Sequence, residues 1–344
     1  MQAKYFKHQL QFKKPARTSR GEMQTHTAWI VSLKKNNKTA YGEASPLPGL
    51  SVDDCSNFET QLQNCCNLLN DGLPANMLPI DDLPSLRFAF EAAQLGLLNN
   101  APFCYGKNPF YKGLPIAING LVWMDDAEAM LNQAVEKIES GFNCIKFKVG
   151  ALDFDEECRM LEKFRKRFNA FTCEIRLDAN GAFSKDDVSE KLQDLSRFEI
   201  HSIEQPVKPG QAELLEELVK KTQIPIALDE ELIGLSHEAG EKLLNKIRPH
   251  YLILKPTLIG GLRAADEWIN IARKMQIGWW ATSALESAIG LNIIAQWVSA
   301  KNNPMPQGLG TGGLFTNNFA SPLVVSEGKL HYSQTGNGQE WLIR

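Results

Sequence analysis

The stretch CIKFKVG, residues 144–150, places two lysines one residue apart in an otherwise apolar run. Side chains of a β-strand alternate between two faces, so Lys146 and Lys148 point the same way. Ile145, Phe147 and Val149 would occupy the other face. A solvated edge strand is the ordinary explanation of such a lysine pair. The segments that surround this stretch favour a buried strand whose two lysines project into a site.

Short apolar segments with the character of β-strands recur every roughly 25–30 residues from about residue 113 onward. Amphipathic stretches of helical periodicity follow them, for example at 125–141 and 211–222. The eight strand candidates are 115–120, 143–149, 174–179, 201–206, 225–230, 251–255, 277–282 and 305–310. Eight such units predict a (β/α)₈-type barrel in the α/β class. A doubly wound open sheet is the alternative, but it usually has fewer strands and a glycine-rich phosphate turn after the first one.

The first 110 residues lack this alternation of short strands and helices. Residues 28–33 read as a strand and 34–39 as a hairpin turn, and helices are expected over 51–70, with Ser51 as N-cap, and over 83–100. We therefore predict an α+β capping domain over residues 1–110 and a barrel over 111–314. A tail over 315–344 is expected to return to the capping domain.

Composition limits the function classes. The chain has 344 residues, of which 43% are hydrophobic and 22% charged, as in globular enzymes. The net charge is −3 and the basic residues are dispersed, which argues against a nucleic-acid partner. No apolar run approaches the roughly 18–20 residues that span a bilayer, and the polar beginning of the chain lacks a signal core. With seven cysteines and no C-x-x-C spacing, we expect a cytoplasmic protein without a membrane partner.

Polar side chains gather where the predicted barrel strands end, which is where this fold places active sites. Carboxylates on three successive strands repel one another unless a cation neutralises them. Oxygen ligands without His or Cys favour Mg²⁺, whereas a polar rim of interleaved salt bridges is the structural alternative. In strand order the residues are Lys146 and Lys148; Arg176, Asp178 and Asn180; Glu204; Asp229 and Glu230; Lys255; Ser283 and Glu286; and Gly310 and Thr311.

This arrangement resembles the muconate-lactonizing subgroup of the enolase superfamily. The resemblance rests on K-x-K at 146–148, D-x-N at 178–180, Glu204, the Asp229–Glu230 pair and Lys255. Within the subgroup, YGEASPLPG (41–49), SLRFAFEAA (85–93), RLDAN (176–180) and QGLGTGGLFTNN (307–318) are most similar to the o-succinylbenzoate synthase family. The superfamily removes a proton α to a carboxylate and stabilises the resulting anion with a divalent cation.

The resemblance implies a role for each residue. Asp178, Glu204 and Asp229 are expected to bind Mg²⁺, for which Mn²⁺ could substitute. Lys148 is the expected base, with Lys146 and Mg²⁺ as neighbouring charges that would lower its pKa, and Lys255 is the expected cation opposite it. Substrate contacts are assigned to Lys146, Ser283, Glu286 and the Gly310–Thr311 turn, for which an unliganded loop is the alternative. Arg176 and Asn180 are expected to orient Asp178, with Glu230 beside the metal ligands. Residues 17–23 are expected to form a mobile loop that closes over the barrel mouth, and residues 44–51 a stiffer segment that lines the pocket; two surface loops are the alternative.

The implied function is an Mg²⁺-dependent lyase of menaquinone biosynthesis that acts on a small anionic carboxylate. N-succinylamino acid racemization and muconate-type cycloisomerization remain open, because those substrates are anionic too. A Schiff-base aldolase is a rival enzyme, because it would also use a barrel lysine such as Lys255. An aldolase has no use for three converging carboxylates, however. A non-catalytic, metal-stabilised barrel is the non-enzymatic alternative. A homo-oligomer is compatible with the sequence.

Overall fold

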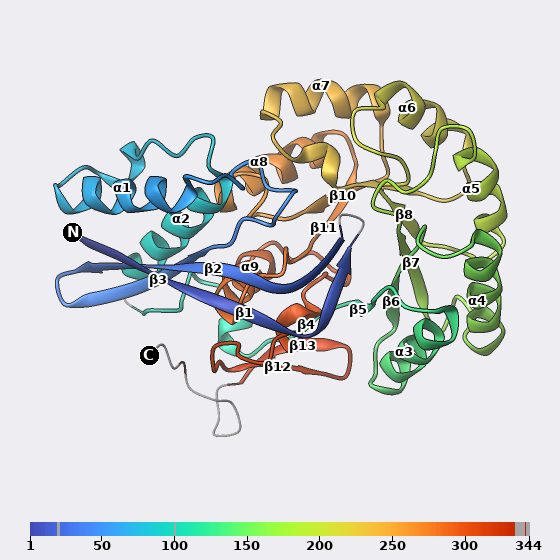
Figure 1. Ribbon diagram of the computed structural model, residues 1–344, viewed down its shortest axis with the longest axis horizontal. Helices are drawn as coiled ribbons and strands as arrows, with labels where there is room; N and C mark the ends of the chain where they lie inside the picture. Colours follow the sequence, from blue (N-terminus) through green and yellow to red (C-terminus); the bar gives the residue numbers. More distant parts are fainter. Residues whose placement is uncertain (19–20, 100, 334–340, 342–344) are drawn as a thin grey trace.

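The computed structural model describes residues 1–18, 21–99, 101–333 and 341. Figure 1 shows two parts, a curled parallel sheet surrounded by helices and a cap of long strands beside it. Among the described helices, none combines the length and hydropathy needed to cross a bilayer.

The curled sheet contains seven parallel strands that are hydrogen-bonded in sequence order from β5 to β11. The strand residues that face the helices, such as Ile145 and Phe147, are apolar and fully buried, as expected for a parallel sheet covered on its outer face. The strands are β5 (Gly120–Val122), β6 (Cys144–Lys148), β7 (Glu174–Asp178), β8 (Ser202–Glu204), β9 (Ile226–Leu228), β10 (Tyr251–Leu254) and β11 (Gly278–Ala281).

The eighth position of the barrel is filled by an irregular segment. Residues 305–310 form no regular strand, but two isolated parallel bridges join them to both ends of the sheet. One bridge joins Gln307 to Ile118 and the other joins Gly308 to Thr282. The predicted barrel class is therefore confirmed, while the regular eighth strand expected from the sequence is replaced by local bridging.

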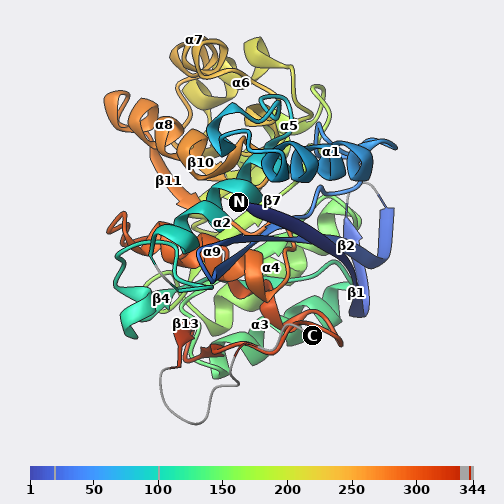
Figure 2. The same ribbon diagram turned by 90° about the vertical axis from the view of Figure 1, so that its left-hand side faces the viewer.

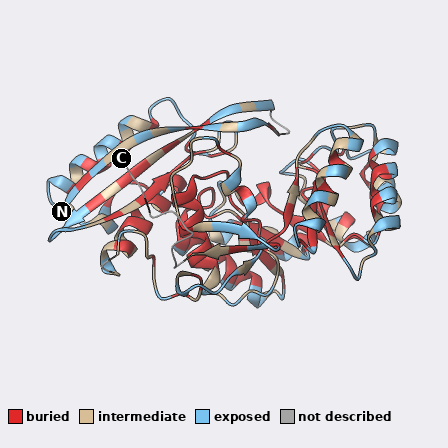
Figure 3. Cartoon of the chain, turned by 90° about the horizontal axis from the view of Figure 1, so that it is seen from below, coloured by how far each residue is buried: buried red, intermediate tan, exposed pale blue. Residues whose placement is uncertain are grey.

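Helices cover the outside of the sheet (Figures 1 and 2). Figure 3 shows their exposed outer faces and the buried residues between them and the strands. They are α3 (Ala127–Glu139), α4 (Phe154–Arg167), α5 (Val188–Ser196), α6 (Ala212–Lys221), α7 (His237–Ile247), α8 (Gly261–Lys274) and α9 (Ala288–Ser299). Short 3₁₀ turns are η1 (Ala75–Met77), η2 (Phe110–Lys112), η3 (Glu230–Leu232) and η4 (Gly310–Gly313).

The cap combines a three-stranded antiparallel sheet with two helices. Its elements are β1 (Gln2–Thr18), β2 (Gly21–Lys35), β3 (Lys38–Ala44), α1 (Phe58–Asn70) and α2 (Pro84–Leu98). Gly42 lets β3 approach α2 closely, because an added Cβ would lie 1.9 Å from the carbonyl oxygen of Ala89. The prediction that a helix begins after Ser51 was wrong, because α1 begins at Phe58. Ser51 instead closes a turn, since its Oγ accepts a hydrogen bond from the N–H of Leu47 at 2.7 Å.

The last described residues lie beside both parts of the molecule. The N–H of Thr316 donates to the carbonyl of Gln11 in β1, at 2.9 Å. Farther along, β12 (Leu323–Ser326) and β13 (Lys329–Tyr332) form a small sheet with β4 (Ile116–Ala117). Because β4 takes this pairing, the first predicted barrel strand is divided and only β5 enters the parallel sheet. The domain boundaries at 110 and 314 stay predictions.

Candidate active site

A cavity of about 380 Å³ lies at the carboxyl ends of the barrel strands, under the cap. The cap contributes the described part of the β1–β2 turn (Gly21, Glu22 and Met23) and the 47–50 segment. Residues 19–20 of the expected mobile loop lie outside the described residues. The barrel contributes Asn119, Leu121, Trp123, Lys146, Lys148, Asp178, Asn180, Glu230, Lys255, Thr282–Leu285, Gly308, Gly310 and Thr311.

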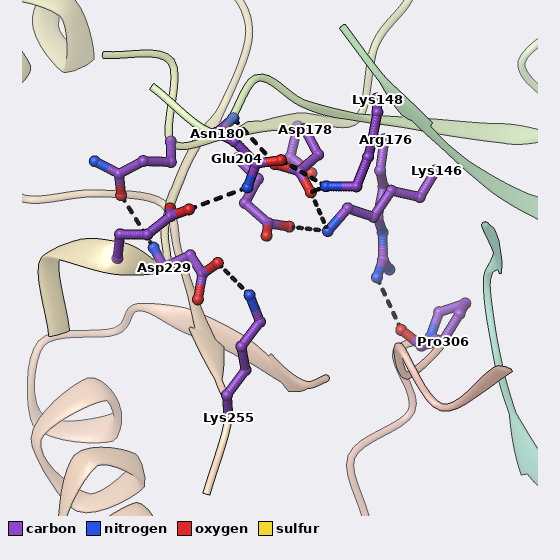
Figure 4. Close-up of polar contacts among 12 residues, drawn as sticks. Lys146, Lys148, Arg176, Asp178, Asn180, Glu204, Asp229, Lys255 and Pro306 are labelled. Carbon is purple, nitrogen blue, oxygen red and sulfur yellow. Dashed lines mark hydrogen bonds and ion pairs between the residues drawn. The ribbon is translucent and has the colours of Figure 1, made fainter. Parts of the chain in front are cut away.

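Lys146 joins two of the predicted metal ligands. Its Nζ lies 2.9 Å from Asp178 Oδ2 and 2.6 Å from Glu204 Oε2, and all three side chains are almost fully buried (Figure 4). Burial opposes the ammonium form, but the two carboxylates outweigh it and raise the pKa of Lys146. Burial beside Asp178 raises the pKa of Glu204 to about 7. Asp178 behaves in the opposite way, because the surrounding lysines outweigh burial and lower its pKa.

Lys148 shares Asp178 with Lys146 and also contacts Asn180. Its Nζ donates to Asp178 Oδ2 at 3.1 Å and to Asn180 Oδ1 at 2.5 Å. Asn180 in turn donates from Nδ2 to Glu230 Oε1 at 3.0 Å. Asn180 adopts a left-handed backbone conformation, with φ of 44°, which Asn tolerates better than most residues. This conformation places its amide between Lys148 and Glu230.

Lys255 reaches the same space from the end of β10. Its ammonium group pairs with Asp229 Oδ2, and its side chain is 13% exposed. Burial disfavours the charged form, but the Asp229 and Glu204 carboxylates prevail and raise the pKa of Lys255. Figure 4 shows Lys255 pointing toward the carboxylates from a strand well separated from β6. The structure therefore brings the three predicted lysines and the three predicted ligands together. Glu204 and Asp229 pair with lysines that line the cavity but do not line it themselves.

The acidic residues have the donor chemistry of an Mg²⁺ site. Buried oxygens Glu204 Oε1 and Glu230 Oε2 have no hydrogen-bond partner, and such atoms suit a hard cation. Within the described residues, however, no three metal-binding side chains are already gathered around one point. Lysine contacts hold the carboxylates of Asp178, Glu204 and Asp229 instead. The carboxylate oxygens are suitable ligands for a divalent cation. Some of the lysine–carboxylate ion pairs must break before these oxygens could bind one.

A second wall of the cavity is built from hydroxyl groups. Ser283 Oγ donates to Glu286 Oε2 at 2.5 Å and accepts from Thr311 Oγ1 at 2.8 Å. Thr257 Oγ1 donates to the other oxygen of Glu286. Ser283 and Thr311 line the cavity together with Gly310, whereas Glu286 is fully buried behind Ser283 and is absent from the lining. Glu286 is thus placed to act on Ser283 rather than on a substrate.

Arg176 does not orient Asp178, contrary to the sequence expectation. It lies two residues earlier on β7, nearer the amino end of the barrel. Its guanidinium donates to Glu174 at 2.7 Å and to the Pro306 carbonyl at 2.8 Å, and it stacks 4.0 Å from the centre of the Trp280 ring. Arg176 and Asp178 share one face of β7, but this did not bring their side chains into contact. The guanidinium of Arg176 instead points toward Pro306 (Figure 4).

Sequence reasoning missed the contribution of the first barrel segment to the cavity. Asn119, Leu121 and Trp123 all line it, and their spacing of two is the signal of a shared face. The buried atoms Asn119 Oδ1 and Thr282 Oγ1 have no hydrogen-bond partner. Glu43 was also missed. It is buried on β3 and accepts hydrogen bonds from the N–H groups of Ser287 and Gly290 at the start of α9.

Comparison with known proteins agrees with this architecture. The family described as "Enolase C-terminal domain-like" matches residues 129–342, and "MenC, N-terminal domain" matches residues 1–97. An o-succinylbenzoate synthase of Desulfotalea psychrophila is 39% identical over 97% of this chain and 99% of its own length.

Solved structures give the same result. The crystal structure of MenC from D. psychrophila LSv54 has a TM-score of 0.87 and 38% identity, and the match covers 96% of this chain and 99% of that one. The o-succinylbenzoate synthase of Thermosynechococcus elongatus BP-1, solved with Mg in its active site, has a TM-score of 0.72 at 23% identity, covering 90% and 92% of the two chains, which shows the fold alone. The chain therefore belongs to the enolase superfamily and, within it, to the o-succinylbenzoate synthase family.

Proposed function

We propose that this chain dehydrates 2-succinyl-6-hydroxy-2,4-cyclohexadiene-1-carboxylate to o-succinylbenzoate. The observation that carries the proposal is the 39% identity to an o-succinylbenzoate synthase over nearly the whole of both chains, cap and barrel included. The cavity adds a physical reason, since Lys146 and Lys255 supply positive charge for an anionic substrate and Lys148 lines the same space.

The reaction removes one proton and one hydroxide from neighbouring ring carbons. Lys148, in its neutral form, takes the proton α to the ring carboxylate. The electrons of that C–H bond pass into the ring, the neighbouring C–O bond breaks, and the hydroxide leaves as water with the proton from Lys148. The product ring is aromatic, so the second step is strongly downhill, and one lysine on one face suffices.

The other residues prepare this step. Asp178, Glu204 and Asp229 would hold Mg²⁺, which supplies positive charge that stabilises the substrate carboxylate as negative charge develops on it. Lys146 holds the substrate carboxylate, and Lys255 faces the developing charge from the opposite side of the barrel.

The test is direct. Purified protein with Mg²⁺ should convert the cyclohexadiene to the aromatic product, which is followed by the appearance of the aromatic ultraviolet band. Absence of conversion at micromolar enzyme would overturn the proposal and return the racemase and cycloisomerase functions to consideration. Four further predictions accompany this function. Metal replacement tests the use of Mn²⁺, and genetic complementation tests a place in menaquinone biosynthesis. Cell fractionation tests a cytoplasmic location, and sedimentation tests a homo-oligomer.

A further inference from the structure

The hydroxyl wall of the cavity contains a chain of hydrogen bonds whose direction can be derived. An ionised carboxylate has no hydrogen to give, so Ser283 and Thr257 must both donate to Glu286. The single hydroxyl hydrogen of Ser283 is thereby used. Its contact with Thr311 at 2.8 Å then requires the hydrogen of Thr311. Both hydroxyls that line the cavity consequently present only lone pairs to a ligand.

This direction conflicts with an anionic ligand at the wall. The N–H of Leu285 also donates to Ser283 Oγ, at 3.2 Å, so the hydroxyl already has acceptor contacts inside the protein. A carboxylate or carbonyl oxygen placed against Ser283 and Thr311 would meet lone pairs on both sides. One additional proton on Glu286 reverses the situation, because Glu286 can then donate to Ser283. That frees one hydroxyl hydrogen, of Ser283 or of Thr311, to point into the cavity.

We propose that Glu286 is a positioning residue that takes up a proton when the substrate binds, and that this proton turns the Ser283–Thr311 wall into a hydrogen-bond donor for a substrate carboxylate or carbonyl oxygen. The inference rests on the proposed function, whose substrate carries a second carboxylate and a ketone on its succinyl side chain. Glu286 acts through Ser283 and does not itself touch the ligand.

The surroundings of Glu286 agree with this role. The residue is fully buried, and burial raises its pKa even though the hydroxyls of Ser283 and Thr257 oppose the rise. Glu43 faces it from the cap: a Cβ added to Gly290 would lie 2.5 Å from Cβ of Glu286 and 3.0 Å from Oε2 of Glu43. On the segment that carries Thr257, the nearest charged residue in sequence is Lys255, which is paired with Asp229. A second buried acid near Glu286, with that lysine engaged elsewhere, favours the neutral form further.

The experiment measures proton uptake on binding of o-succinylbenzoate with Mg²⁺ present. Calorimetry at pH 8 in two buffers of different ionisation enthalpy gives the number of protons bound. The wild type should take up about one proton more than Glu286→Gln, since the amide retains donor hydrogens and cannot ionise. Above the ionisation of Glu286, wild-type affinity should fall by up to about tenfold per pH unit relative to that of Glu286→Gln. Glu91→Gln is the matched control. Glu91 is an acid on α2 that accepts from the N–H groups of Leu262 and Arg263, outside the cavity lining, and this variant should behave as wild type.

Each outcome decides the inference. Equal proton uptake in wild type and Glu286→Gln overturns it. If Glu286→Gln does not fold, Ser283→Ala replaces it: loss of the redirected hydroxyl should weaken binding by roughly tenfold or more and remove the extra proton. Conversion of the cyclohexadiene without Glu286-dependent uptake sinks the inference and leaves the proposed function intact. Glu286-dependent proton uptake without conversion supports the role of Glu286 and overturns the proposed function. A protein that neither binds o-succinylbenzoate nor converts the cyclohexadiene overturns both proposals.

Discussion

Two groups of buried carboxylates differ in the partners that surround them. Asp178, Glu204 and Asp229 are paired with lysine ammonium groups. Glu43 and Glu286 instead receive hydrogen bonds from hydroxyls and backbone N–H groups (Glu43 from Ser287 and Gly290).

The difference has a chemical consequence. Full positive charges close to a carboxylate favour its ionised form, whereas neutral donors only partly offset the cost of burial. The lysines prevail at Asp178, whose pKa is lowered, whereas burial still raises the pKa of Glu204 and that of Asp229. A metal cation could replace the lysine ammonium groups beside these three carboxylates. The hydroxyl-bonded group can relieve its burial by taking up a proton. We therefore expect metal binding at the first group and proton-linked binding at the second.

Removal of the metal should have the largest effect. Incubation with EDTA is expected to abolish dehydration, and added Mg²⁺ should restore it. The protein should stay folded without metal, because Lys146 and Lys255 already neutralise the carboxylates. Activity and circular dichroism measured on the same sample check both parts. Turnover that is indifferent to chelation would contradict the metal assignment.

Lys148→Ala should reduce kcat by roughly 10²- to 10⁴-fold, the usual contribution of a general acid–base group. Lys146 cannot replace it, because it lies two residues earlier on β6, roughly 6–7 Å nearer the amino end. Lys255→Arg is the matched variant and should retain measurable activity, since its proposed task needs charge and not proton transfer. Steady-state kinetics and exchange of the α-proton in ²H₂O distinguish the two lysines. Near-normal turnover by Lys148→Ala would show that the base is another residue.

Lys146→Met should lower the free energy of unfolding by about 3–5 kcal/mol, because it leaves buried Asp178 and Glu204 without their shared ammonium group. Added Mg²⁺ should recover part of this loss in the variant if the carboxylates can hold the cation. Chemical denaturation with and without Mg²⁺ provides the measurement. A variant as stable as wild type in EDTA would show that the lysine does not neutralise this group.

Glu43 should make stability depend on pH in the direction opposite to that of an ordinary salt-bridged acid. Burial raises its pKa from 4.5 to about 7, although the donors from Ser287 and Gly290 oppose the rise. Between these values the folded chain binds more protons than the unfolded chain. Its contribution to stability is therefore fully present below about pH 4.5 and is lost as the pH rises toward 7.

Comparison with Glu43→Gln isolates this contribution. At pH 5 the wild type should be more stable by about 1–3 kcal/mol, because the amide leaves one N–H of α9 without an acceptor. The advantage should shrink by pH 8. Thermal unfolding across this range measures the difference, with exposed Glu238→Gln as control. A constant difference would mean that Glu43 does not titrate in this range.

An exposed ion pair should give the smallest effect. Lys242 lies 2.7 Å from Glu238 one turn earlier on α7, and the two side chains are 76% and 81% exposed. Lys242→Ala should change the free energy of unfolding by less than about 0.5 kcal/mol and leave turnover unchanged, because water screens the pair. A cost comparable to that of Lys146→Met would remove the distinction between buried and surface pairs.

The sequence by itself determined the barrel class and the end of the cavity that carries charge. Both depend on short-range regularities: alternation along β6 places Lys146 and Lys148 on one face, and active-site residues follow the carboxyl ends of parallel strands. For the same reason Asp178, Glu204 and Asp229 could be expected together before any contact was known. Their proposed roles still await the experiments above.

Only the tertiary structure decided the surroundings of the buried acids Glu43 and Glu286. Glu43 and Ser287 are 244 residues apart, and no local periodicity relates a cap strand to the start of a barrel helix. Arg176 shows the converse, because correct strand phase did not reveal that its guanidinium turns toward Pro306 and Trp280. The eighth barrel position and the split of β4 from β5 likewise depend on which distant segment supplies the pairing. Period and spacing are properties of the chain, whereas the direction of a long side chain and the partner of a buried acid depend on what the fold packs against them.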